Sequence, residues 1–97
     1  MEDRTLQELP GAEIVLAGIA DLKEGRMSTN ALAVQSAAPR LRSLGLEAES
    51  AEGRTPAAHR LYDLLHEELG DAAHSRYNAI LSRVASFAQA AERARVR

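Results

Sequence analysis

The chain has 97 residues with a formal net charge of −2 at pH 7, and it contains no cysteine. This length predicts a single domain spanning residues 1–97. The near-neutral charge gives no general attraction to nucleic acid or anionic lipid. The lack of cysteine excludes disulfides, thiolate metal sites and cysteine nucleophiles.

The distribution of hydrophobic residues indicates the cellular location of the protein. No apolar run approaches the ~18 residues of a membrane span, and the acidic N-terminus lacks the apolar stretch of a signal peptide. We therefore expect a cytoplasmic protein that does not associate with membranes. Arginine far outnumbers lysine, which fits a GC-rich bacterial genome.

Residues 1–11 are polar apart from Leu6 and Leu9, and they end in the helix-breaking pair Pro10-Gly11. A loose N-terminal tail and a single helical turn both fit this composition.

Residues 12–24 predict a helix closed by Gly25. Its apolar residues cover more than half of the circumference: Ile14, Val15, Gly18, Ile19 and Leu22. An arc this wide predicts burial on two sides, by the bundle or by a second subunit. Glycine inside a helix costs ~1 kcal/mol relative to alanine, so we expect another helix to approach closely at Gly18.

The next apolar stripe runs from Ala31 to Leu44 and keeps its phase across Pro39. An interior proline costs ~3 kcal/mol or splits a helix. We predict one kinked helix over residues 29–44, ended by Gly45. The alternative is two helices, with Pro39 at the first position of the second.

Residues 45–55 are acidic and lack periodicity, and we predict a mobile loop. Thr55-Pro56 then signals a helix start, with an N-cap oxygen followed by proline at the first helical position. The helix is predicted over residues 56–69.

The last helix, over residues 71–94, is predicted to organise the fold. Gly70 suits the C-cap of the preceding helix and Asp71 the N-cap of this one, so the two helices should form a hairpin with a very short turn. One face is apolar and the opposite face polar: Ala73, Tyr77, Ile80, Val84, Phe87 and Ala91 against Asn78, Ser82, Ser86, Gln89 and Arg93. The fold class is therefore all-α, a small bundle of four main helices with a C-terminal αα-hairpin.

A candidate metal site is formed by His59, Asp63 and His66, which share one face of the predicted helix 56–69. Imidazoles and a carboxylate arranged in this way can ligate zinc or a similar cation. The face lies opposite the apolar stripe, however, and exposed His–Asp pairs are ordinary helix-surface interactions. We favour a solvated face and predict no cofactor.

A basic surface is the second candidate site, and it would contact phosphate groups. Its residues are Arg40, Arg42, Arg76, Arg83 and Arg93. No aromatic residues alternate with them for base stacking, so a solvated arginine face is the competing interpretation.

We expect a non-catalytic interaction module that acts through self-association or a partner protein. The alternative is a small nucleic-acid-associated regulator that uses the arginine surface. No acid–base pair stands out as buried, so no catalytic residue is assigned. The alanine-rich core and the weakly charged outer face of the last helix favour a homodimer or higher homo-oligomer. The predicted interface residues are Ile14, Gly18, Asn78, Ser82 and Ser86.

Overall fold

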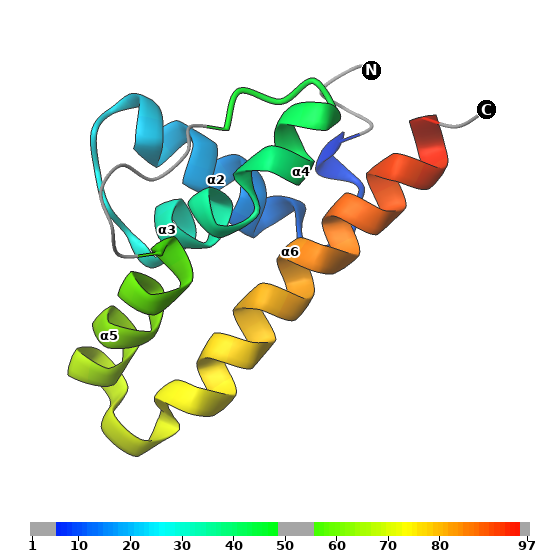
Figure 1. Cartoon of the computed structure of the whole chain (residues 1–97). Helices are drawn as coiled ribbons and strands as arrows, with labels where there is room; N and C mark the ends of the chain where they lie inside the picture. Colours follow the sequence, from blue (N-terminus) through cyan, green and yellow to red (C-terminus); the bar gives the residue numbers. More distant parts are fainter. Residues whose placement is uncertain (1–5, 49–55, 96–97) are drawn as a thin grey trace.

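A computed structural model describes the backbone of residues 6–48 and 56–95, and the side chains of these residues except Arg95. Within these ranges the chain is helical and has no strand, which confirms the predicted all-α fold with a long last helix (Figure 1). The elements are α2 (Ala12–Lys23), α3 (Thr29–Ser36), α4 (Ala38–Ser43), α5 (Ala57–Leu69), the 3₁₀ turn η1 (Gly70–Ala72) and α6 (Ala73–Arg95).

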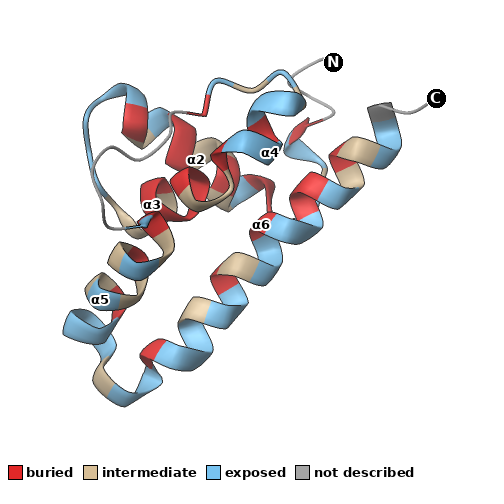
Figure 2. Cartoon of the chain, in the orientation of Figure 1, coloured by how far each residue is buried: buried red, intermediate tan, exposed pale blue. Residues whose placement is uncertain are grey.

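The core lies around α3, which is covered by α2, α5 and α6 (Figure 2). Five consecutive residues of α3, from Ala31 to Gln35, are buried. The apolar stripe predicted for the last helix faces this core: Ala73, Ile80, Val84, Phe87 and Ala91 are buried and Tyr77 is half-buried. The opposite face of α6 is exposed, as expected.

Gly18 lies where α2 meets α3. A Cβ atom added there would come within 2.4 Å of the Asn30 carbonyl oxygen and 2.5 Å of Val34 Cγ2. The expected close helix approach is therefore present, but the approaching helix belongs to the same chain. Gly18 is buried by α3 and is not part of the exposed surface.

The chain before α2 packs onto the core from Leu6 onward. Leu6 is buried, and its carbonyl oxygen accepts a hydrogen bond from the Leu9 N–H. Gly11 has a φ of 78° and lies against the Arg83 backbone, so that an added Cβ would clash with the Arg83 carbonyl oxygen. A residue with a side chain fits neither this conformation nor this space. The rest of the predicted tail, residues 1–5, lies outside the described residues.

The single kinked helix predicted over residues 29–44 is wrong in the structure, which has two helices. Ser28 caps α3 by accepting a hydrogen bond from the Ala31 N–H, and α3 ends at Ser36. Ala37, with a φ of −113°, separates α3 from α4, where Pro39 lies in the first turn. Proline is tolerated there because first-turn N–H groups have no helical partner.

The α5–α6 hairpin turns differently from the prediction. Helix α5 begins at Ala57 after Pro56, and the predicted cap Thr55 lies outside the described residues. Gly70 ends α5 as its predicted C-cap, but its φ of 58° and ψ of −122° lie outside the left-handed helical conformation that a glycine cap usually adopts. Asp71 does not cap α6 but lies within the turn η1.

The arms of the hairpin separate from the turn as a V, as Figure 1 shows. Near the turn they are joined by an edge-to-face contact between Tyr62 and Tyr77, whose ring centroids lie 5.3 Å apart. Farther along, α3 packs between the arms against both α5 and α6, and α2 packs against α6.

The start of the predicted 45–55 loop packs on the core. Leu46 is half-buried and Ala48 is buried, while the remaining part, residues 49–55, lies outside the described residues. None of the helices in the described part of the chain combines the length and hydrophobicity that a membrane crossing needs.

Candidate interaction groove

The predicted metal ligands do not come together as a site. His59, Asp63 and His66 are exposed on α5, and His66 stacks on the Tyr62 ring at a centroid distance of 6.4 Å. Across residues 6–48 and 56–95, no three histidine, aspartate or glutamate side chains form a group that could hold a metal ion. The solvated-face interpretation fits this arrangement.

Two of the five candidate arginines are held by carboxylates. The Arg40 guanidinium donates two hydrogen bonds of 2.7 Å to the two carboxylate oxygens of Glu92, joining α4 to α6. These bonds hold the pKa of the Glu92 carboxyl below its usual value. Arg83 forms an ion pair with Glu13, joining α6 to α2. Both arginines carry structural contacts, which reduces the positive charge offered to a phosphate.

The other three arginines are spread over the molecule. Within the described part of the chain, Arg42, Arg76 and Arg93 make no ion pair. Arg76 lies in the first turn of α6 and Arg93 near its end, about 25 Å away at 1.5 Å of rise per residue. The five arginines are therefore divided between separate places and do not form one continuous phosphate-binding surface.

The predicted interface residues also lie in separate places. Asn78, Ser82 and Ser86 are exposed on the outer face of α6, where Asn78 Nδ2 lies 3.2 Å from His74 Nε2. Ile14 is half-buried beside α6, and Gly18 is buried under α3.

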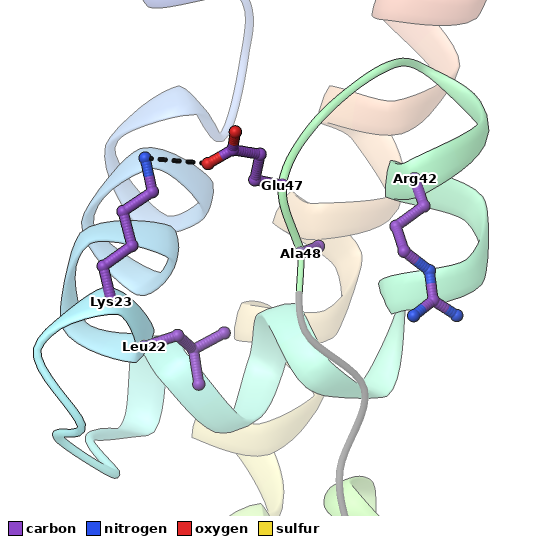
Figure 3. A pocket seen from close by; sticks show the side chains of 5 residues that line it. All are labelled: Leu22, Lys23, Arg42, Glu47 and Ala48. Carbon is purple, nitrogen blue, oxygen red and sulfur yellow. Dashed lines mark ion pairs between the residues drawn. The ribbon is translucent and has the colours of Figure 1, made fainter.

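A first pocket, of about 270 Å³, lies between the end of α2, α4 and the segment that follows α4 (Figure 3). Leu22 and Ala48 supply apolar wall, and Arg42 lines the side formed by α4. Lys23 reaches across to Glu47 at 3.2 Å. These two charges satisfy each other, which leaves Arg42 as the charged side chain of this pocket without an ion-pair partner in the described residues.

A second pocket, of about 280 Å³, lies between α5 and the start of α3. Leu32, Leu64 and the exposed Met27 form its apolar part, and Arg60, Asp63 and Glu67 surround it. Charges of both signs are mixed along its edge. Asp63, one of the proposed metal ligands, therefore lies at the rim of a partly apolar hollow.

The third hollow, of about 390 Å³, is the one we call the α2–α6 groove. It is lined by Glu13, Ile14, Arg76, Ala79, Ile80 and Arg83. Ile80 is buried, Ile14 is half-buried and Ala79 is exposed, so apolar side chains run from the core to the surface. The charged groups beside them are the Arg83–Glu13 ion pair and Arg76, which has no ion-pair partner in the described ranges.

The groove brings together residues that the sequence assigned to two different candidates. Ile14 was predicted as an interface residue, and Arg76 and Arg83 as phosphate-binding residues. Sequence reasoning missed Ala79 and Glu13. The sequence places Glu13 next to Ile14 on the predicted helix, so it could have been named as a neighbour of that interface residue. Its ion pair with Arg83 could not, because that pair depends on how α2 packs against α6.

Comparisons with protein-family models, with curated proteins and with solved structures found no match.

Proposed function

We propose that this chain is a non-catalytic helical interaction module and that the α2–α6 groove binds a second copy of the chain. The observation that supports this is the groove itself, where Ile14 and Ala79 leave apolar surface open over the buried Ile80. Beside them lies Arg76, which has no ion-pair partner in the described residues. An apolar centre with a charged rim is the usual composition of a protein interface.

The charges favour a second copy as the occupant. Arg76 and Arg83 outweigh Glu13 at the groove, so its rim is basic. The exposed surface of α5 is acidic, because Asp63, Glu67 and Glu68 all lie there. Complementary potentials of this kind steer association and fix its orientation. Two copies of the chain therefore carry both halves of a charge-complementary contact.

The test is the molar mass by light scattering coupled to gel filtration at tens of micromolar protein. We expect about twice the monomer mass of 10.5 kDa for the natural chain. Ala79→Arg should shift the mass to that of the monomer, because the new side chain fills the groove at an exposed helix position. The natural chain eluting as a monomer would rule the proposal out.

Ala85→Arg is the matched control, since Ala85 is an exposed alanine of the same helix and does not line the groove. It should leave the mass of the dimer unchanged. Ser82→Arg probes the outer face of α6. If Ser82→Arg dissociates the dimer and Ala79→Arg does not, the interface is the outer face and the groove is not the binding surface.

Heparin chromatography separates this proposal from the nucleic-acid alternative. We expect the chain to elute at low salt. Strong retention that salt reverses, and that is lost in Arg76→Ala and Arg93→Ala, would favour a phosphate-binding role over self-association.

A further inference from the structure

One apolar side chain stands out at the turn of the hairpin. Leu69, the last residue of α5, is 44% exposed. It is one of two large hydrophobic residues in the described ranges that are this open, the other being Met27. Glu68 and Asp71 flank it and are also exposed. We call these three residues, Glu68, Leu69 and Asp71, the α5–η1 tip.

The tip and the α2–α6 groove have matching chemistry. The tip presents one leucine between two carboxylates, and the groove presents apolar side chains beside Arg76 and Arg83. Neither Glu68 nor Asp71 has an ion-pair partner among residues 6–48 and 56–95, and neither does Arg76. The positive charge at the groove and the negative charge at the tip are thus both open to an external partner.

The tip does not fill the groove of its own chain, because none of its residues lines it. Both features nevertheless border the same half of the molecule: η1 leads directly into α6, and the groove is lined by α6 residues from Arg76 to Arg83. Because the tip and the groove lie near each other, the tip of each copy can enter the groove of the other copy, and a two-fold axis then relates the two contacts. A closed, symmetric dimer is the commonest soluble assembly.

We propose that the α5–η1 tip is the segment that occupies the α2–α6 groove of a second copy. Leu69 enters the apolar part of the groove, and the carboxylates of Glu68 and Asp71 meet Arg76 at its rim. This assignment rests on the proposed self-association and names the surface that carries it out.

The first test replaces the leucine. Leu69→Ser removes one buried leucine from each of the two equivalent contacts, and each loss costs about 10- to 100-fold in dissociation constant, so the dimer should weaken by about 100-fold or more. Met27→Ser is the control, because Met27 is 43% exposed but lies beside a different pocket. It should leave the dissociation constant, measured by analytical ultracentrifugation, unchanged.

The second test exchanges the charges. Arg76→Glu and Asp71→Arg should each weaken the dimer by about tenfold or more, because each places like charges against one another. The double variant should recover part of the affinity, since it restores one opposite-charge pair in reversed order while Glu68 still faces the carboxylate introduced at position 76. Arg93→Glu, on the same helix but away from both surfaces, controls for the change in net charge.

The outcomes separate the two proposals. If Ala79→Arg dissociates the dimer while Leu69→Ser behaves like Met27→Ser, the groove binds a second copy through another segment and the tip assignment is wrong. If the double variant remains as weak as the single variants, the charge pairing is wrong. Masses that grow continuously with concentration would show an open head-to-tail chain and overturn the reciprocal dimer.

Discussion

At Gly18 the backbones of α2 and α3 leave no room for a methyl group. Gly18→Ala should gain ~1 kcal/mol of helix propensity, but its Cβ would lie 2.4 Å from a backbone oxygen that cannot rotate away. Forcing the two helices apart typically costs ~1–3 kcal/mol. We expect a net loss of stability in urea denaturation.

Ala20→Gly measures the propensity alone, because Ala20 is exposed on the same helix. It should destabilise the chain by ~1 kcal/mol. A Gly18→Ala variant more stable than the natural chain would show that α2 and α3 can separate freely.

Glu92 should make stability depend on pH. Its pKa is lowered from the ordinary 4.5 by hydrogen bonds from Arg40. A depressed folded-state pKa contributes stability above the unfolded-state pKa, and this contribution is lost as pH falls through the folded-state value. Arg40→Ala should therefore destabilise the chain at pH 7 and have little effect well below pH 4.5.

The measurement is urea denaturation of both proteins across this range, together with an NMR titration of the Glu92 carboxyl, whose pKa should return toward its ordinary value in Arg40→Ala. Arg93→Ala serves as the control, because Arg93 has no ion-pair partner in the described ranges. An equal effect of Arg40→Ala at pH 7 and pH 3 would mean that the pair does not contribute through the charge of Glu92.

Among the elements, α6 carries the largest share of the core. Val84 is 2% exposed in the middle of its apolar stripe. Val84→Asp would bury a charge that has no partner, and we expect the helical circular dichroism signal and the cooperative thermal transition to be lost. Ala85→Asp places the same charge at the next, exposed position and should keep both. A folded Val84→Asp variant would mean that the stripe is not core.

The regular elements could be predicted from the sequence, because apolar spacing determines which face of a helix is buried. The bounds of α2, α5 and α6 agree with the predicted ranges to within two residues. The break before Pro39 was the alternative that the proline itself allowed, and the structure has it. Apolar spacing could not choose it over one kinked helix, because the apolar stripe keeps its phase on both sides of Pro39. The η1 turn was missed for a similar reason, because Asp71 suits a cap and a 3₁₀ turn equally well.

On the scale of the whole molecule, self-association should appear in thermal unfolding. A ligand that binds only the folded state raises its stability, and a second copy acts as such a ligand. The melting temperature of the natural chain should therefore rise with protein concentration, whereas that of Ala79→Arg should not. A melting temperature independent of concentration in both proteins would contradict the dimer.

The groove itself could not be predicted. Sequence spacing placed Ile14 on one helix and Arg76 on another, but which turn of α2 faces which turn of α6 depends on how the whole bundle packs. Gly18 shows the same limit, because the pattern indicated a close helix approach without identifying α3 as the helix involved.

The contact between Gly11 and the Arg83 backbone joins two residues that the ribosome makes at different times. Ribosomes add about 5–20 residues per second, so roughly 4 to 14 s separate the appearance of these two residues. From their own synthesis until that of α6, α2 and α3 lack the wall that α6 provides. Val15 and Val34, both fully buried in the finished fold, have an incomplete cover during this time. A slower rate of translation lengthens the time for which these side chains lack that cover.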